Sequence, residues 1–390
     1  MRILGIVAEY DPFHRGHERH LRLAREMVQP DFTYVVLSGC FKQRGELAML
    51  SPYDRAECAL RCGADAVFSL PAVWKVRDAE HYALGAVALL KSLGITHLAF
   101  GMESPEDGAA AGAELVRRTA EMLENPTESL RKSLRAALQQ GAGYPRAMSF
   151  ALAEEDPEAA ELASRPNSLL AVCYLRAILR LGGGIQPVAI PRNGSYHGET
   201  PDPGEPSASY IRDALGRGDY GHAFEAVPPI SGEIIRRAFL EQRIPREEIL
   251  DQLLIRRLRE MDPEEAKLLP DVSEGLERRL LEAAARARTR KQLLEETVTR
   301  RYTRARISRI CAAALLGVTR KDTERAPLPA EAVLLGLKRK PEMTALWKKG
   351  GVPVTSREHG EADLQAWRIR SQCTGEADTL PWTEKIVSVN

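Results

Sequence analysis

Cysteine is scarce in this sequence, and its distribution excludes the common cysteine-based sites. The 390 residues include six cysteines, none of them in a CxxC pair and none at the spacing of a Cys/His ligand set. Cys58 and Cys62 lie one helical turn apart, which favours packing over metal binding. No carboxylate cluster dedicated to magnesium is visible in the sequence either. We therefore expect a reduced protein without a metal centre of its own.

Long apolar runs are missing as well. No stretch approaches the ~20 apolar residues that span a bilayer, and no signal peptide precedes the apolar segment that begins at Ile3. The sequence therefore predicts a cytoplasmic protein with no membrane partner. With 44% hydrophobic and 28% charged residues, a chain of 390 residues is long enough for two or three globular domains.

The net charge of only +1 conceals an uneven distribution. Residues 1–230 carry 24 Lys/Arg and 29 Asp/Glu, a balance of −5, whereas residues 231–390 carry 31 and 25, a balance of +6. Residues 300–309 hold five arginines around Tyr302 and no acidic residue. A solvated helix face is the ordinary alternative for such a run. The lack of compensating acids and the interleaved tyrosine favour RNA or another phosphate polymer as partner.

Strand and helix patterns alternate in the first hundred residues. Apolar runs at 3–8, 32–37, 64–70 and 96–100 predict strands, and 52–62 and 79–92 predict helices, an order typical of a parallel sheet with right-handed crossovers. Residues 105–182 show only helical spacing, and 185–190 form one more strand pattern. We expect an α/β, Rossmann-like parallel sheet over residues 1–225, with a helical insertion at about 105–182.

The remaining residues, 226–390, predict a mainly helical, basic domain. The helical pattern runs from residue 228 to about 343 almost without a break, and arginine-rich helices are expected over 274–290 and 291–301. Residues 352–390 predict either a small terminal lobe or strand pairing.

The stretch that organises the chain is residues 3–20. An apolar strand is followed by a loop and then by His14-Arg15-Gly16-His17 at the start of a helical pattern. Two imidazoles three residues apart lie on one helix face. Backbone N–H groups at a helix start are unpaired and therefore suit a phosphate. Gly16 has no Cβ, which allows the phosphate to approach closely. Solvated surface histidines and a metal pair are the alternatives, but zinc needs a third ligand and usually a pair four residues apart. The pattern predicts a nucleotide phosphate site.

Two further segments are typical of phosphate binding. Ser209 and Arg212 open a helix after a Pro/Gly-rich loop and share one face of it, where a hydroxyl and a guanidinium can hold phosphate oxygens. Alone this pattern is more often a helix cap, but paired with the upstream histidines it indicates a second phosphate cradle. The loop 38–46, with Lys42 and Arg44, follows the carboxyl end of a strand, where open α/β sheets bind ligands. An ordinary surface loop is the alternative.

A strand, a loop and an HxGH at a helix start are the signature of the nucleotidylyltransferase superfamily, and the chain closely resembles one branch of it, the tRNA(Met) cytidine acetate ligases. The resemblance covers residues 1 to beyond 310, while the last 25 residues fit it poorly. The matching stretches are GIVAEYDPFHRGH, SGCFKQRGELA, HYALGAVALLKSLG, FGME, SRPNSLLAVCY, PRNGSYH, SASYIRDAL, EGLERRL and TRRYTRARISRI.

The resemblance implies an ATP-dependent ligase. Such an enzyme activates acetate as acetyl-adenylate, releases pyrophosphate, and transfers the acetyl group to the wobble cytidine of elongator tRNA(Met), giving 4-acetylcytidine, with no role for DNA. ATP is then a co-substrate, and whether Mg²⁺ accompanies it stays open. Two alternatives also stay open: a small-molecule adenylyl- or cytidylyltransferase, and a non-catalytic RNA-binding protein with a relict nucleotide pocket.

The resemblance also implies roles for particular residues. His14, His17 and Arg212 are expected to be catalytic. Asn167 has an alternative role as a cap of the helix after Pro166. The nucleotide pocket is expected to comprise Val7, Ala8, Glu9, Tyr10, Phe13, His14, Gly16, His17, His20, Gly101, Asn167, Arg192 and Ser209. The tRNA is expected to contact Arg286, Arg290, Arg300, Arg301, Arg304, Arg306 and Arg309.

Overall fold

A computed structural model of the chain describes residues 1–103, 109–141, 143–192, 206–273, 275–356, 360–376 and 386–389. Its centre is one eight-stranded sheet in the order β5-β4-β1-β2-β3-β6-β7, with β8 paired to β6. The strands from β5 to β3 are parallel, and β6 runs antiparallel to β3. The strands are β1 (Ile3–Ala8), β2 (Phe32–Ser38), β3 (Ala66–Leu70), β4 (His97–Glu103), β5 (Gln186–Arg192), β6 (Ala332–Lys338), β7 (Val354–Thr355) and β8 (Val387–Val389).

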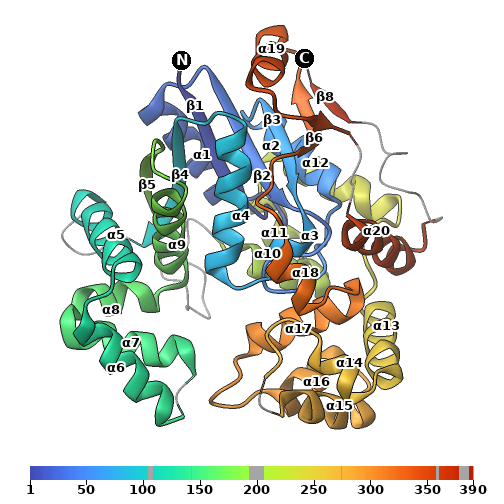
Figure 1. Cartoon of the computed structure of the whole chain (residues 1–390). Coiled ribbons are helices and arrows are strands. Elements are labelled where there is room, and N and C mark those ends of the chain that lie inside the picture. The colour runs from blue at the N-terminus through green and yellow to red at the C-terminus, as the bar shows by residue number, and fades with distance from the viewer. Residues whose placement is uncertain are drawn as a thin grey trace.

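Helices cover both faces of the sheet because its strands are apolar on both sides. In β2, Tyr34 and Val36 pack with α4 and α9, whereas Val35 and Leu37 pack into the layer of α1 and α2. Figure 1 shows α4 and α9 crossing the front of the sheet. The helices of the first half are α1 (Arg15–Val28), α2 (Pro52–Arg61), α3 (Ala72–Lys75), α4 (Ala79–Ser92), α5 (Ala109–Glu124), α6 (Glu128–Gln139), α7 (Tyr144–Glu155), α8 (Pro157–Ser164) and α9 (Pro166–Arg180).

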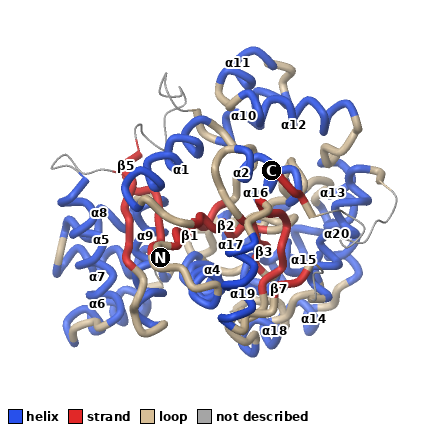
Figure 2. The backbone as a smooth tube through the Cα atoms, turned by 90° about the horizontal axis from the view of Figure 1, so that it is seen from above, coloured by secondary structure: helices blue, strands red, loops and turns tan. Residues whose placement is uncertain are grey.

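Helices α10–α17 and α20 share a core with α1 and α2, whereas α19 packs on the side of α4 and α9. In Figure 2 helices α10, α11 and α12 lie together at one edge of the molecule, and their buried residues share a core with α1 and α2. None of the helices in the described ranges is long and apolar enough to cross a membrane. The helices are α10 (Ala208–Gly216), α11 (Tyr220–Glu225), α12 (Pro229–Leu240), α13 (Glu247–Glu260), α14 (Pro263–Lys267), α15 (Leu276–Arg286), α16 (Arg290–Thr297), α17 (Arg304–Leu316), α18 (Arg320–Arg325), α19 (Pro341–Gly350) and α20 (Glu361–Thr374).

Two groups of helices lie at the end of the sheet that is opposite the N-terminus of the chain. Figure 1 shows α5–α8 as one group and α13–α17 as the other, both near the edge where the parallel strands end. The predicted α/β fold, its parallel core and its helical insertion are confirmed. Ligands of open α/β sheets bind at the carboxyl ends of the strands, so a ligand is expected at this end of the sheet.

The C-terminal segment returns to the sheet, which the sequence pattern did not indicate. Residues 332–338 form β6, so the helix predicted through this stretch is wrong there. An apolar run this short cannot be assigned to helix or strand by periodicity alone, and its partner β3 lies over 260 residues away in sequence. Strand pairing in the tail is confirmed by β7 and β8. A buried ion pair of 2.8 Å between Lys75 and Asp363 ties α20 to α3.

Candidate active site

The HxGH segment folds into a helix cap made by its own two histidines. His14 is the N-cap of α1, and its Nδ1 accepts a 3.1 Å hydrogen bond from the Gly16 backbone N–H. In return, the His17 Nδ1 accepts a 3.3 Å hydrogen bond from the His14 backbone N–H. The two rings stack with 3.6 Å between their centroids. The segment is therefore a capping box in which imidazoles take the places that Ser/Thr and Glu usually fill.

This cap determines which ring nitrogen can donate to a ligand. A neutral imidazole carries its proton on the nitrogen that does not accept. Because both Nδ1 atoms accept from the backbone, the proton of each ring lies on Nε2. Each of the stacked rings therefore has its N–H on Nε2, a type of donor that phosphate oxygens accept.

The expectation of unpaired backbone N–H groups at the start of α1 is wrong. The Arg15 N–H donates to the carbonyl of Ala226 over 3.0 Å, and the Gly16 N–H is taken by His14. The His17 N–H donates to the His14 carbonyl over 2.9 Å. Side chains satisfy a helix start as well as a ligand does. The imidazoles and the positive end of the helix dipole, and not these backbone N–H groups, are the features of this helix start that suit a phosphate.

Two aromatic side chains, Tyr10 and Phe13, pack against the ring of His17. The ring of Tyr10 lies 4.9 Å from that of His17, and the ring of Phe13 lies 5.8 Å from it. Both aromatic side chains are buried and pack against the His17 ring. Val7 and Ala8, at the end of β1, are half-buried. Tyr10 has a φ of +52°, a region that non-glycine residues rarely adopt. Burial raises the pKa of its hydroxyl well above the usual value.

Arg212 joins this segment from α10. Its Nη1 donates a 2.6 Å hydrogen bond to the carbonyl of Asp11, and its Nη2 lies 3.4 Å from the Ser209 Oγ. Ser207 is the N-cap of α10, so Ser209 belongs to the first turn and faces Arg212, as the spacing predicted. The structure thus brings the SxxR segment to the loop that precedes the two histidines.

Arg212 lies next to a cluster of three charged side chains, Asp11, Lys42 and Glu46. The Lys42 Nζ is 2.8 Å from the Glu46 carboxylate and 3.4 Å from that of Asp11, and Arg212 is 3.8 Å from each. Burial disfavours the charged form of Asp11, but Lys42, Arg212 and Arg55 outweigh it and hold the pKa of this carboxyl below its usual range. Lys42 is buried in this cluster, whereas Arg44 is exposed.

Arg55 is a central residue that sequence reasoning missed. It is fully buried, and its guanidinium donates to the carbonyls of Glu9 (2.7 Å), Ser38 (2.9 Å), Gly39 and Leu50 (3.2 Å). One side chain therefore fixes the ends of β1 and β2 and the loop after β2. A cation on the otherwise apolar face of the 52–62 helix was the available signal, because buried arginine needs partners.

Gly101 and Asn167 lie at the carboxyl end of β4. Gly101 is near the carboxyl end of β4 and pairs with Ile190 of β5. The Asn167 Nδ2 donates a 2.6 Å hydrogen bond to the Glu103 carboxylate, which also accepts from the backbone N–H of Ser168 over 2.8 Å. Glu103 thus fixes the start of α9. Arg192 is the last residue of β5, and its side chain lies outside the described part of the chain. Residues 193–205, which belong to the predicted Pro/Gly-rich loop, also lie outside the described part.

The arginines predicted to contact tRNA fall into two groups. Arg300 and Arg301 are exposed before α17, and Arg304 is exposed in its first turn. The others hold the protein together. Arg286 pairs with Glu296 at 2.9 Å, Arg290 donates to Gly45 and Ser308, Arg306 donates to Asp271 and Ser273, and Arg309 pairs with Asp271 at 3.5 Å.

The described residues contain no group of three or more His, Cys, Asp and Glu side chains placed to hold a metal ion. His20 lies on α1 one turn after His17, on the same side of that helix.

The fold and the paired histidines define a nucleotidyl transferase of the HxGH type. Consistent with this, residues 1–360 match the model of the HIGH Nucleotidyl Transferase family. The chain is 32% identical over 362 residues (91% of this chain and 84% of the relative) to the tRNA(Met) cytidine acetate ligase of Fervidobacterium nodosum. It is 38% identical over 314 residues (79% of this chain and 73% of the relative) to that of Syntrophotalea carbinolica.

Two solved structures are similar as well. Thermotoga maritima TmcAL, without ligand, aligns with a TM-score of 0.85 at 32% identity, over 91% of this chain and 86% of that chain. The same protein bound with alpha-thio ATP aligns with a TM-score of 0.84 at 31% identity, over 92% and 86% of the two chains. The chain belongs to the tRNA(Met) cytidine acetate ligase family within the HIGH nucleotidyl transferases.

Proposed function

We propose that this protein uses ATP and acetate to acetylate the wobble cytidine of elongator tRNA(Met). The observation that carries the proposal is the meeting of Arg212 with the HxGH segment through the carbonyl of Asp11. The two imidazoles and the guanidinium then belong to neighbouring segments, which suits the α-phosphate and the following phosphates of a nucleoside triphosphate.

In the first step the acetate carboxylate attacks the α-phosphorus of ATP. A P–O bond forms to acetate, the bond to the β-phosphate oxygen breaks, and pyrophosphate leaves. His14 and His17 donate to the equatorial oxygens, where negative charge develops. Arg212 and Ser209 hold the departing phosphates. The acetate oxygen, which is otherwise a poor leaving group, becomes part of AMP.

In the second step the exocyclic amine of cytidine attacks the carbonyl carbon of acetyl-adenylate. The C–N bond forms, the C–O bond to AMP breaks, and the amine releases one proton. This amine is barely basic, so the protein contributes positioning more than proton abstraction. The cytosine must also leave its stack to reach the cleft, as for other enzymes that act on nucleobases.

The pocket residues and the domains belong to the same proposal. Residues 7–20, with Gly101, Asn167 and Arg192, surround the nucleotide, and residues 1–225 form the catalytic domain. Residues 226–390 form the tRNA-binding domain, although β6–β8 join the catalytic sheet. The exposed arginines Arg300, Arg301 and Arg304 bind the anticodon arm, which gives the affinity its salt dependence. All substrates of this reaction are cytoplasmic.

An ATP–pyrophosphate exchange assay tests the proposal. Exchange that requires acetate is the expected result. Exchange that requires a phosphorylated small molecule would instead indicate a small-molecule nucleotidyltransferase, and no exchange under any condition would indicate an RNA-binding protein without activity.

A further inference from the structure

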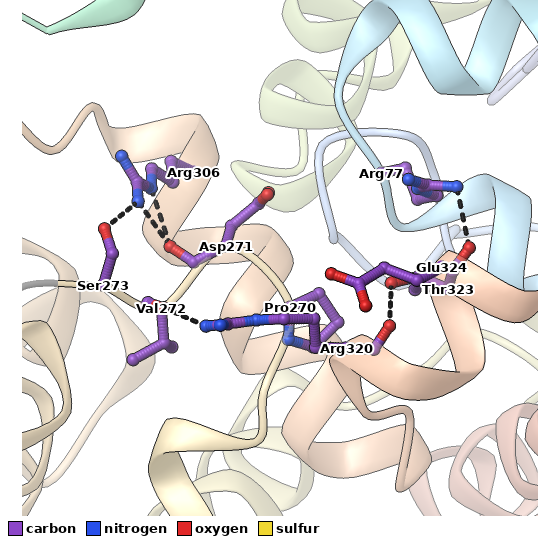
Figure 3. Close-up of a pocket in the computed structure, with 9 residues that line it drawn as sticks. All are labelled: Arg77, Pro270, Asp271, Val272, Ser273, Arg306, Arg320, Thr323 and Glu324. Atoms are coloured by element: carbon purple, nitrogen blue, oxygen red, sulfur yellow. Dashed lines mark hydrogen bonds between the residues drawn. The ribbon is translucent and has the colours of Figure 1, made fainter.

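A pocket separate from the nucleotide cleft lies between the two halves of the chain. Its cavity of about 300 Å³ is bounded by the α14–α15 connection, α17, α18 and Arg77, which follows α3. Figure 3 shows three guanidinium groups around it, Arg77, Arg306 and Arg320, each on a different element. Arg77 comes from the sheet domain, and the other two come from the basic half.

Each of these arginines is held mainly by neutral oxygen atoms. The Arg77 Nη1 donates to the carbonyl of Thr323 over 3.0 Å, and the Arg306 Nε donates to that of Asp271 over 3.0 Å. Arg320 donates to the carbonyl of Val272. A guanidinium has five N–H donors, and carbonyl acceptors fix its orientation without neutralising its charge. The pocket therefore keeps positive charge in a fixed geometry.

The charge count within the pocket is positive. Asp271 and Glu324 are the two carboxylates in its lining, and Asp271 also pairs with Arg309 at 3.5 Å. The lining itself thus has three guanidiniums and two carboxylates. The Nε of Arg309 is buried without a hydrogen-bond acceptor among the described residues. Arg309 pairs with a lining residue but does not line the pocket itself.

The surroundings indicate which anion this pocket takes. Arg306 lies in the first turn of α17, a helix of 13 residues with no acidic residue at its start, so the helix dipole adds to the positive charge. The exposed Arg300, Arg301 and Arg304 lead to this helix start. A track of arginines that ends in a pocket suits a charged polymer better than a free ion.

The pocket is connected to the nucleotide cleft by one residue. The Gln43 Nε2 donates to the carbonyl of Arg77 over 2.8 Å, and the Gln43 backbone N–H donates to the Glu9 carboxylate over 2.8 Å. An RNA backbone fixed at Arg77 would therefore pass close to the end of β1, where the reaction is proposed.

We infer that Arg77, Arg306 and Arg320 form a phosphodiester subsite for the RNA substrate, which holds the backbone next to the reacting cytidine. The inference takes its RNA from the proposed function. Phosphate contacts position a nucleic acid without reading its sequence, so this subsite fixes the register of the flipped nucleotide and does not select it.

Binding of an RNA stem-loop with the anticodon-arm sequence, measured over a range of salt concentrations, tests the inference. Arg77→Gln is the main variant because its side chain makes one hydrogen bond to the protein. Arg320→Lys is the second variant and keeps the positive charge. Arg22→Gln, an exposed arginine paired with Glu26 on α1, is the matched control for lost charge.

Arg77→Gln is expected to weaken RNA binding about 10-fold and to make the slope of log affinity against log salt shallower by about 1. Arg320→Lys is expected to weaken binding while keeping the wild-type slope. Arg22→Gln is expected to match the wild type. RNA affinity and slope for Arg77→Gln equal to those of Arg22→Gln would overturn the inference. An equal loss of RNA-free, acetate-dependent exchange in Arg77→Gln would also overturn it, because the residue would then support the nucleotide cleft.

The same measurements separate this inference from the proposed function. If the wild type binds the stem-loop but shows no acetate-dependent exchange, the proposed function fails and the subsite is judged on the binding data alone. If the wild type catalyses the exchange and Arg77→Gln binds RNA like the control, the subsite fails alone.

Discussion

Arg212 donates a 2.6 Å hydrogen bond to the carbonyl of Asp11 across 201 positions of the chain. This contact brings α10 to the loop that leads into the two histidines. Arg212 also lies within 3.8 Å of the carboxylates of Asp11 and Glu46. These anions keep the guanidinium in place before a triphosphate binds, and phosphate oxygens replace them as its partners in the proposed complex.

Substitution of Arg212 is expected to weaken ATP binding. Arg212→Ala should raise the KM for ATP in the acetate-dependent exchange by about 10-fold or more, because a charge-assisted hydrogen bond contributes about 1.5–3 kcal/mol. Arg217→Ala, at the exposed end of the same helix, is the control and should leave the KM unchanged. Equal KM values for the two variants would contradict the placement of Arg212 at the phosphates.

His17 is expected to serve both the reaction and the helix cap, and two substitutions separate these roles. Glutamine can accept the His14 N–H in a capping box, so His17→Gln should keep the stability of the wild type. His17→Ala should lose about 1 kcal/mol of unfolding free energy in urea. Both variants should lose about 10²–10³-fold in acetate-dependent exchange, because neither side chain has an imidazole N–H at the position of the His17 Nε2.

RNA binding should be near normal in both His17 variants. The charge reversals Arg301→Glu and Arg304→Glu should give the opposite pattern, with RNA binding weakened and acetate-dependent exchange retained. If a His17 variant behaved like the charge reversals, the separation of the nucleotide cleft from the RNA surface would be wrong.

Gly45 lies where the loop after β2 meets α17, and an added side chain should separate them. Its φ is +75°, and a Cβ there would lie 2.9 Å from the Arg309 Cα and still closer to the Ser308 carbonyl. Gly45→Ala should therefore destabilise the protein by more than the ~1 kcal/mol that backbone strain alone costs. Gly182→Ala, with φ +83° and open space, is the strain-only control. Equal unfolding free energies in urea would show that this contact contributes no stability.

Asp54 should make stability depend on acid pH. Burial disfavours its charge, but Arg243 at 2.6 Å, the Ser51 hydroxyl and Arg370 together outweigh burial and lower the pKa of this carboxyl. A lowered folded-state pKa stabilises the protein above the unfolded value of about 3.9, and this stabilisation is lost as pH falls through the folded value.

Asp54→Asn should cost about 1.5–3 kcal/mol at pH 7 because it removes one of the two carboxylates that pair with the partly buried Arg243. The difference from the wild type should shrink below about pH 4. Urea unfolding across this pH range measures it, with the exposed Glu26→Gln as control. A difference that stays constant with pH would show that charge is not its cause.

The fold was predictable where local pattern determines it. The strand over residues 3–8 and the helix over 79–92 have the predicted bounds, because apolar runs and helical spacing identify them. β6 was missed because it depends on pairing with β3, far away in sequence.

The candidate site was predictable as residue types but not as contacts. The sequence indicated that His14 and His17 act together, yet the capping box and the Nε2 donors follow only from the backbone geometry. Arg55 and the Asp11–Lys42–Glu46 cluster went unseen because buried charges are recognised by their partners, which sequence spacing does not reveal.

Mass spectrometry of tRNA nucleosides, after incubation of the protein with ATP, isotope-labelled acetate and elongator tRNA(Met), tests the proposed reaction most directly. The account predicts 4-acetylcytidine that carries the label at the wobble position, formed together with AMP and pyrophosphate and absent when ATP is omitted. Unmodified cytidine in the presence of all three substrates, with ATP unconsumed, would contradict it.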